Sequence, residues 1–220
     1  MLFLRTLGWL LCVLYSTIPL FWLMVHPRAH IWREKQRSPF RVLVPAWIVM
    51  WFGVGAITQP WHSIALYSTP WSWIPAAFLF TTGISLYAKS GKHFSWAQLG
   101  GLPEVRGNVR RENVRNSDAG NKSAGSNHAE NKNSESTSHD QHLVTTGIRA
   151  HVRHPVYLAH LCEMLAWSIG TGLAVCWLLT AFAVLTGAIM IRMEDAELEK
   201  RFGEEYAVYR NHVPAVLPRF

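Results

Sequence analysis

Residues 147–170 read GIRAHVRHPVYLAHLCEMLAWSIG, a basic strip that turns at Pro155 into a nearly continuous apolar run. Proline suits the first turn of a helix, where its missing N–H costs nothing, so we place a helix start there. The apolar run ends at Ile169, and after a Gly-Thr-Gly link a second one extends from Leu173 to Ile191. Two apolar helices joined by so short a link predict a helical hairpin.

Three earlier segments are also apolar enough to cross a lipid bilayer, whose hydrocarbon core of roughly 30 Å takes about 20 residues of helix. They run from Leu7 to Val25, from Val42 to Ile57 and from Trp71 to Tyr87. A cleaved signal peptide is the alternative for the first segment, but no small-x-small cleavage site precedes His26. Half of the 220 residues are hydrophobic and only 16% are charged. The sequence therefore predicts an all-α integral membrane protein with about five transmembrane helices, three of them within residues 1–90.

The distribution of Lys and Arg predicts how the helices are oriented in the membrane. The segment from His26 to Arg41 holds five basic residues and one acidic residue, whereas the links 58–70 and 170–172 hold no charge. Basic loops stay on the cytoplasmic side, so we expect an outside N-terminus and a cytoplasmic C-terminus, in a bacterial inner membrane or one like the endoplasmic reticulum. The same bias, with attraction to anionic lipid, explains the net charge of +7 better than nucleic-acid binding does.

Residues 104–141 form a polar interval without an aromatic residue, dominated by Asn, Ser, Gly, Lys and Glu. Such a composition cannot bury enough apolar surface to offset the entropy cost of ordering, so we predict a disordered cytoplasmic insert. His139 and His142 have H-x-x-H spacing, but no cysteine lies nearby and we predict no metal site. The three cysteines of the chain fall within apolar segments and are predicted to be packing residues.

Charged residues gather at the predicted cytoplasmic ends of the hairpin. Arg153 and His154 directly precede its first helix, whose free N-terminal amides also attract an anion. Glu194 and Asp195 follow its second helix at the same depth. We therefore expect cationic and anionic side chains to converge on one pocket at the lipid boundary. The alternative for Arg153 alone is snorkelling toward lipid headgroups.

Glu163 is the one acidic residue inside any predicted span, and His160 lies three residues before it on the same helical face. A carboxylate that faces lipid costs about 3 kcal/mol or more, so an ionisable group at this depth indicates a function or a buried partner. We retain both interpretations. Glu163 is either catalytic or part of a structural hydrogen bond with His160 that holds helices together.

The C-terminal region predicts one further helix outside the membrane. Leu198, Phe202, Tyr206 and Tyr209 recur at spacings of four, four and three, with Glu and Lys between them. This pattern gives one apolar face and is typical of an amphipathic tail helix that lies on the membrane surface.

Residues 143–219 carry motifs that resemble a known enzyme family. LVTTG at 143–147 precedes RHPVY at 153–157, and RMEDAELEKRFGEEYAVYRNHVPAVLPR follows the hairpin at 192–219. An RHPxY motif followed at this distance by an acidic pair, FGxEYxxY and VPxxxPR is similar to the isoprenylcysteine carboxyl methyltransferases and the related phospholipid N-methyltransferases. The resemblance covers about a third of the chain and identifies 142–220 as a methyltransferase-like region.

The resemblance implies an integral membrane enzyme that binds S-adenosylmethionine in a cytoplasmic pocket and methylates a lipid or prenylated small molecule from the bilayer. Carried over by position, it assigns cofactor contacts to Gln141, His142, Leu143, Val144, His154, Pro155, Tyr157, Glu194 and Asp195. It also makes Arg153 and Arg192 candidate catalytic residues that orient the acceptor. After Gly147 the family usually has Pro-aromatic-Arg, whereas this chain has Ile-Arg-Ala, so any aromatic contact from that turn is lost or replaced by Arg149.

Methyl transfer from a sulfonium is an in-line displacement that needs alignment and exclusion of water. A carboxylate acceptor is already anionic and needs a guanidinium to place it, whereas an amine must first lose a proton to a base such as Glu163 or His160. The arginines favour carboxyl O-methylation of an isoprenylcysteine-like thiol acid, with N-methylation of a phospholipid or another lipid amine as the alternative. A sterol-type reductase that uses NADPH and a non-enzymatic membrane adaptor are the alternatives of other classes.

Overall fold

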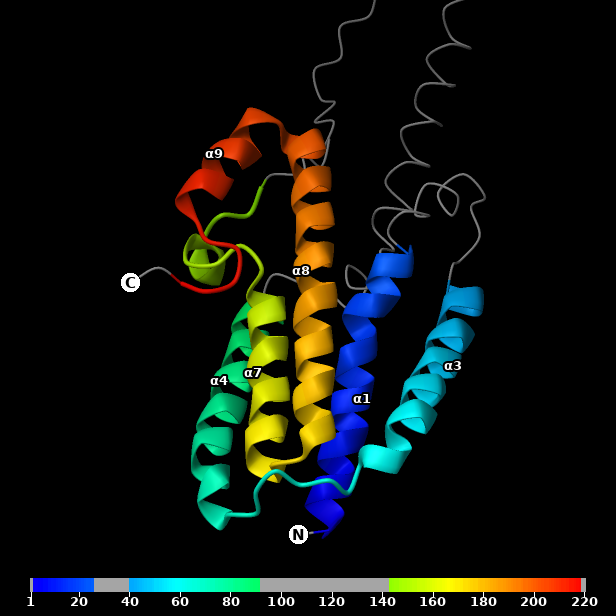
Figure 1. The fold of residues 1–220 in the computed structure, drawn as a ribbon. Coiled ribbons are helices and arrows are strands. Elements are labelled where there is room, and N and C mark those ends of the chain that lie inside the picture. Colours follow the sequence, from blue (N-terminus) through cyan, green and yellow to red (C-terminus); the bar gives the residue numbers. More distant parts are fainter. Residues whose placement is uncertain (1, 26–39, 92–142, 219–220) are drawn as a thin grey trace, which may run out of the picture.

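The computed structural model describes residues 2–25, 40–91 and 143–218, and the predicted insert at 104–141 lies outside the described residues. The described chain is helical apart from its connections and one isolated bridge between Ala65 and Leu173. The longer helices are α1 (Leu2–Val25), α3 (Phe40–Thr58), α4 (Trp73–Gly91), α7 (Pro155–Thr171), α8 (Ala174–Phe202) and α9 (Glu204–His212), shown in Figure 1. Short 3-10 helices occur at Gln59–Trp61, Pro70–Ser72 and Gly147–Ala150.

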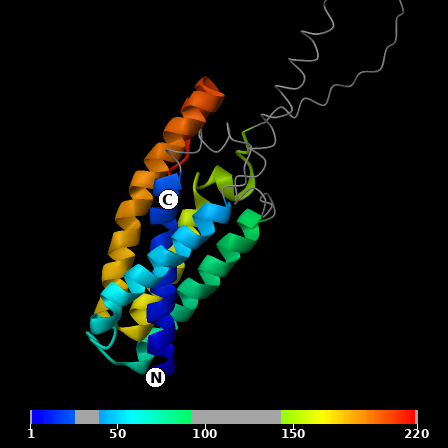
Figure 2. The ribbon, with the colours of Figure 1, turned by 90° about the vertical axis from the view of Figure 1, so that its right-hand side faces the viewer.

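Five of these helices form an antiparallel bundle. Helices α1, α4 and α8 run toward one end and α3 and α7 run back, so that α9 lies at the end opposite the N-terminus (Figure 1 and Figure 2). Helix α4 packs along α7, and α1 packs against both α7 and α8. Helix α3 lies on the outside of the bundle and packs against α1.

The core lies where α1 crosses the hairpin of α7 and α8. Cys12 of α1, Met164 and Trp167 of α7 and Cys176 of α8 are all buried there. The helices approach closely because a small residue stands at the crossing, and a side chain added at Gly8 would collide with Trp167. All three cysteines of the chain are buried and free, in agreement with their predicted packing role.

The predicted hairpin is present, and Gly172 makes its turn. This residue has a φ of 66°, in the left-handed region, and ends α7 by donating its N–H to the carbonyl of Ser168 at 3.1 Å. The connection between α3 and α4 packs against the turn. There the N–H of Leu66 donates to Gly172 at 2.8 Å, and the N–H of Ala174 donates to Ile64 at 3.0 Å. These bonds hold together the end of the bundle that lies farthest from α9.

Three helices are long and apolar enough to cross a membrane, with candidate spans at Leu2–Met24, Leu43–Trp61 and Ala174–Phe202. The described chain is therefore all-helical, with three candidate membrane-spanning helices. Helices α4 and α7 have 19 and 17 residues and are not among these candidates. The total of five transmembrane helices stays a prediction.

The C-terminal region differs from the single tail helix that the spacing predicts. Helix α8 continues beyond the predicted end of its span at Ile191 as far as Phe202, because its last turns consist of good helix formers such as Glu, Lys, Arg and Leu. Gly203 follows with a φ of 61°, and the separate helix α9 begins after it. The predicted apolar face is divided between two helices, with Tyr206 and Tyr209 on α9. Helix α9 turns back toward the start of α7 (Figure 1).

Candidate functional site

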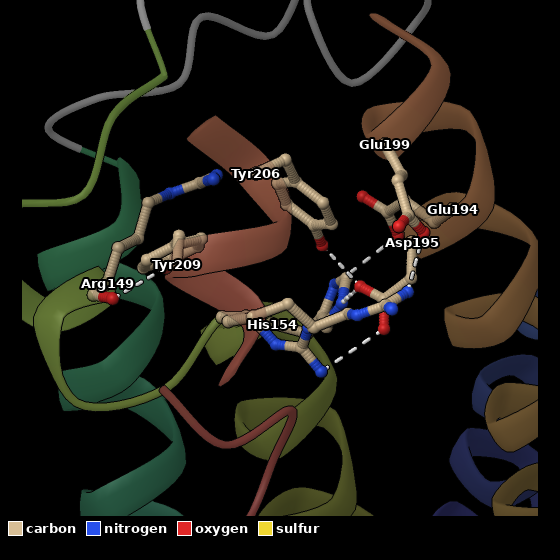
Figure 3. Close-up of polar contacts among 9 residues, drawn as sticks. Arg149, His154, Glu194, Asp195, Glu199, Tyr206 and Tyr209 are labelled. Atoms are coloured by element: carbon tan, nitrogen blue, oxygen red, sulfur yellow. Dashed lines mark hydrogen bonds and ion pairs between the residues drawn. The ribbon is translucent and has the colours of Figure 1, made fainter. Parts of the chain in front are cut away.

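The candidate site lies where the start of α7 meets α8 and α9. His154 directly precedes α7, and Pro155 occupies the first helical position, as the sequence predicts. The buried imidazole of His154 faces two carboxylates of α8 (Figure 3). Its Nε2 lies 2.9 Å from Asp195 Oδ1, and its Nδ1 lies 3.5 Å from Glu194 Oε2. Together with Arg153 and Tyr206, these side chains form what we call the polar cluster.

Asp195 is the centre of the polar cluster, and both of its oxygens are engaged. Oδ1 accepts hydrogen bonds from His154 and from the hydroxyl of Tyr206, and Oδ2 lies 3.2 Å from Arg153 Nη2. The residue is only 9% exposed, and three donors offset the cost of burying its charge. The structure therefore gives Asp195 the role of holding Arg153 and His154 in place. Oδ2 has one donor and can accept a second hydrogen bond, so the direct cofactor contact predicted for Asp195 stays a prediction.

The carboxylates determine the charge of His154. Burial by itself lowers the pKa of the imidazole, but the hydrogen bonds and negative charges of Asp195 and Glu194 outweigh it and raise the pKa to about 9. His154 is therefore a cation at neutral pH, donates from both ring nitrogens and cannot act there as a general base. Burial, followed by the bond to Asp195, also raises the pKa of Tyr206, which keeps its proton and remains a donor.

Helix α9 braces the site through two tyrosine hydroxyls that the sequence analysis missed. Tyr206 is 1% exposed and bonds to Asp195, while Tyr209 donates to the carbonyl of Arg149 at 2.6 Å (Figure 3). These bonds attach α9 to α8 and to the turn Gly147–Ala150. We predicted an apolar face for both rings. The sequence feature that indicates a polar role is the spacing of three residues between Tyr206 and Tyr209, which sets both hydroxyls on one side of a short helix.

The segment Val213–Leu217, which we call the strap, follows α9 and runs beside the start of α7. The N–H groups of Arg153 and His154 donate to the carbonyls of Pro214 and Ala215, each at 2.9 Å. The amides at positions 157 and 158 bond to the carbonyl of His154. The four N–H groups at positions 153, 154, 157 and 158 therefore already have acceptors in the strap and in the first turn. For these four groups, the prediction of free amides that bind an anion is wrong.

Arg153 has unused hydrogen-bonding capacity. Its side chain is 8% exposed, and its Nη2 pairs with Asp195. Its Nε and Nη1 are also buried, and neither has a hydrogen-bond partner in the described part of the chain. Buried donors without partners are costly, so this guanidinium is suited to a ligand that brings oxygen acceptors of its own.

Other predicted residues surround the polar cluster. The hydroxyl of Tyr157, one turn into α7, interacts with Glu194. Glu194 keeps 39% of its side chain exposed and is the carboxylate that a ligand from solvent can reach most easily. Leu143 and Val144 lie before the turn that leads into α7 and are partly or largely exposed.

The described structure does not bring Arg192 into the polar cluster. Arg192 is exposed, and within the described ranges no hydrogen bond or ion pair joins it to the polar cluster. Gln141 and His142 lie outside the described residues.

Glu163 lies more than two turns farther along α7 and has different partners from those expected. Its Oε2 accepts a 2.7 Å hydrogen bond from the hydroxyl of Tyr15 on α1. His160 is bonded elsewhere, with Nδ1 2.8 Å from the hydroxyl of Tyr87 on α4 and Nε2 3.1 Å from the carbonyl oxygen of Tyr15. The alternative of a bond between His160 and Glu163 is therefore wrong. Each side chain instead ties α7 to a neighbouring helix.

A cavity of about 240 Å³ opens beside the polar cluster, between α7, α8, α1 and the strap. Its wall is mainly apolar, with small residues such as Ala183 and Gly187 on α8 and with Val216 and Leu217 on the strap. Tyr157 lines this cavity and also meets Glu194, so that the cavity and the polar cluster share one side chain. An apolar hollow between helices is suited to hydrocarbon.

Residues 133–205 match the model of the phospholipid methyltransferase family. An uncharacterized protein of Haemophilus influenzae is 34% identical over 59 residues, which cover 26% of this chain and 94% of that protein. No solved structure matches the chain. The region that matches the family contains α7, α8 and all four charged residues of the polar cluster. This region is similar to the phospholipid methyltransferase family, a family of membrane methyltransferases.

Proposed function

We propose that the protein is an S-adenosylmethionine-dependent methyltransferase that acts on a lipid-associated acceptor at the membrane boundary. The family match supports methyl transfer and favours it over the reductase and the adaptor. The observation that carries the proposal is the junction at Tyr157, where the polar cluster and the apolar cavity meet. A polar cofactor and an acceptor that bears a hydrocarbon chain can be brought together at such a junction.

The residues around the polar cluster fit S-adenosylmethionine in their chemistry. This cofactor carries an ammonium, a sulfonium and ribose hydroxyls, and the partly exposed carboxylate of Glu194 suits each of these groups. His154 and Tyr157 interact with Glu194 from the α7 side. On this proposal, Leu143 and Val144 contact the cofactor from the chain before α7. When bound, the cofactor supplies an electrophilic methyl group.

Arg153 decides which acceptor the site favours. Its two unpaired nitrogens suit a carboxylate, which a guanidinium holds in a fixed orientation. A carboxylate also needs no proton removed before methylation, which agrees with a polar cluster whose His154 is already protonated. The best-supported reaction is therefore carboxyl O-methylation of an isoprenylcysteine-like thiol acid. Arg192, exposed about one turn before Asp195, is the second candidate for orienting the acceptor.

N-methylation of a phospholipid amine is the second candidate, because the matching family is described by phospholipid methylation. An ammonium must lose its proton before it can accept a methyl group. His160 lines the cavity, but both of its ring nitrogens are engaged by Tyr87 and Tyr15, and Glu163 is bound to Tyr15. The described residues thus support an amine acceptor less well than a carboxylate.

Incubation of membranes that contain the protein with S-adenosylmethionine carrying a radiolabelled methyl group tests the proposal. We expect label in a lipid-soluble product and its release by base as methanol, the mark of an ester. Label that base does not release as methanol and that stays on the amine of a phospholipid headgroup would identify N-methylation instead.

Cofactor binding provides a separate test on the purified protein. Glu194→Ala should weaken saturable binding of S-adenosylmethionine about tenfold or more, since it removes a charged hydrogen-bonding group. The matched control is Glu205→Ala, on an exposed residue of α9 outside the polar cluster, and it should bind as wild type does. Wild-type protein without saturable binding would refute the proposed function.

A further inference from the structure

The strap lies outside residues 133–205, the region that matches the family. Its position is fixed by the polar cluster, because the carbonyls of Pro214 and Ala215 accept from the two amides that precede α7. The next two residues, Val216 and Leu217, line the apolar cavity. Consecutive residues of the strap therefore connect the polar cluster to the cavity wall.

The facing wall of the cavity, on α8, includes several small side chains. Ala183, Gly187 and Ala188 follow one another at spacings of four and one on α8. A methyl group added at Gly187 would lie 3.8 Å from Tyr157, at ordinary contact distance. The short side chains of α8 leave room on this side of the cavity, and the strap lines another side. Leu217 is 69% exposed, which sets an apolar side chain at the outer edge of the cavity.

We propose that the strap selects the hydrocarbon group of the acceptor, with Leu217 as the main specificity-determining residue. This inference rests on the proposed function, because it assigns the apolar part of the acceptor whose reacting end lies at the polar cluster. The occupant is one hydrocarbon chain, since the cavity adjoins the polar cluster at Tyr157 and is mainly apolar. Its volume of about 240 Å³ is below the roughly 300–1,000 Å³ of pockets that enclose whole small ligands, so it takes only part of that chain.

A smaller and a larger side chain at position 217 should shift the preference for bulky acceptor chains in opposite directions. Leu217→Ala enlarges the outer edge of the cavity and favours bulkier chains, whereas Leu217→Trp fills the edge and excludes them. In apolar pockets, one methylene group changes the preference roughly 10–200-fold. Because Leu217 is largely exposed, neither change disturbs a packed core.

Photo-crosslinking tests the occupant without any need for activity. Full-length protein is reconstituted in vesicles of phosphatidylethanolamine and phosphatidylglycerol that contain a phospholipid with a diazirine on its acyl chain. We expect crosslinks on the strap and on α8 near Gly187, and a loss of at least fivefold in Leu217→Trp. The control is Leu185→Trp on α8, because Leu185 is 66% exposed and does not line the cavity. Uniform labelling of all lipid-facing helices, or equal loss in both variants, would overturn the proposal.

A second measurement separates this inference from the proposed function. In methylation assays with acceptors of increasing chain bulk, Leu217→Ala should shift the ratio of kcat/KM values toward the bulkier acceptor about tenfold or more. If the ratio stays unchanged while the wild-type protein binds S-adenosylmethionine, the role of the strap is refuted and the proposed function stands. If the wild-type protein binds no S-adenosylmethionine, the proposed function fails, and the crosslinking result alone decides what the cavity holds.

Discussion

Asp195 gathers donors from two separate parts of the chain, since Arg153 and His154 precede α7 and Tyr206 lies on α9. Because each carboxylate oxygen is engaged, His154 has a fixed orientation and a fixed charge. Arg153 keeps two nitrogens without partners among the described residues. At the scale of single residues, the charge of His154 and the unpaired nitrogens of Arg153 are the properties that substitution tests most directly.

The raised pKa of His154 predicts a pH-dependent stability. The pKa is about 9 in the folded protein, against an ordinary value of 6.5 for the unfolded chain. Protonation of His154 therefore stabilises the fold fully below about pH 6.5, and this contribution is lost as the pH rises through 9. It amounts to about 3 kcal/mol at about 1.4 kcal/mol per pKa unit. The Tm of wild type in detergent should fall more steeply over this range than that of His154→Gln, and parallel curves would contradict the assignment.

Arg153→Lys tests the acceptor site, because lysine keeps the charge but loses the fork of donors. An ammonium can still pair with Asp195, whereas the groups equivalent to Nε and Nη1 are gone. We expect the KM for a carboxylate acceptor to rise about tenfold or more, with the affinity for S-adenosylmethionine changed less than twofold. Arg210→Lys, in the exposed pair with Glu199, is the control. A loss of cofactor affinity as large as the change in KM would instead assign Arg153 to the cofactor.

At the scale of elements, two glycines set the positions of the helices that carry the site. Gly172 joins α7 to α8 and Gly203 joins α8 to α9, with φ values of 66° and 61°. A side-chain carbon at Gly172 would lie 2.5 Å from the carbonyl oxygen of Tyr67, whereas nothing lies within 4 Å of one at Gly203. Both positions need a positive φ, but Gly172 has a ψ of 14°, in the left-handed helical region, whereas Gly203 has a ψ of −132°, which essentially only glycine adopts.

Alanine substitutions at these glycines separate backbone strain from collision. Gly203→Ala should cost backbone strain alone, about 1–3 kcal/mol, because alanine rarely adopts a φ of 61° with a ψ of −132°. Gly172→Ala should cost about 1 kcal/mol for the left-handed backbone and roughly 1–3 kcal/mol more for collision, because it pushes the connection around Tyr67 away from the hairpin. Thermal unfolding in detergent measures both variants. A loss for Gly172→Ala no larger than about 1 kcal/mol, the strain of a left-handed residue alone, would show that Tyr67 does not approach the hairpin turn this closely.

Helices α1, α4 and α7 are also joined by polar contacts inside the bundle, which makes Glu163 a test of structure against catalysis. If the bond to Tyr15 is the function of Glu163, Glu163→Gln should lower the Tm and leave methylation within about threefold of wild type. Tyr15→Phe removes the same bond from α1 and should destabilise by about 1.5 kcal/mol or more. A hundredfold fall in kcat for Glu163→Gln with an unchanged Tm would support the catalytic interpretation instead.

At the scale of the whole molecule, sequence reasoning succeeded for features that depend on one continuous segment of the chain. Apolar length predicted the helices of the bundle, and equal depth at the two ends of a hairpin predicted that Arg153 and His154 would meet Glu194 and Asp195. It failed where side chains from segments far apart in the sequence form hydrogen bonds with one another. The bond between Tyr15 and Glu163 joins residues 148 positions apart, and no local spacing encodes it. The break at Gly203 was signalled by glycine's preference for helix ends, which the apolar spacing obscured.

The bundle has two distinct ends, and their charges predict its orientation. Helices α1 and α3 meet the basic segment 26–41 at the end that carries α9 and the polar cluster, whereas the uncharged links 58–70 and 170–172 belong to the opposite end (Figure 1). The preference of basic loops for the cytoplasm therefore predicts that the site faces the cytoplasm. The cytoplasm is also where a cofactor synthesised in the cell is available.

Cysteine labelling of intact cells tests this orientation. The three native cysteines are buried and should not react, so single substitutions report on their own positions. Ser63→Cys lies exposed at the far end of the bundle, and Asn211→Cys lies exposed on α9. A membrane-impermeant maleimide should label Ser63→Cys in intact cells and Asn211→Cys only after the membrane is permeabilised. The reverse pattern would set the polar cluster on the outside, where S-adenosylmethionine made in the cytoplasm cannot reach it, and the proposed reaction could not then occur at this site.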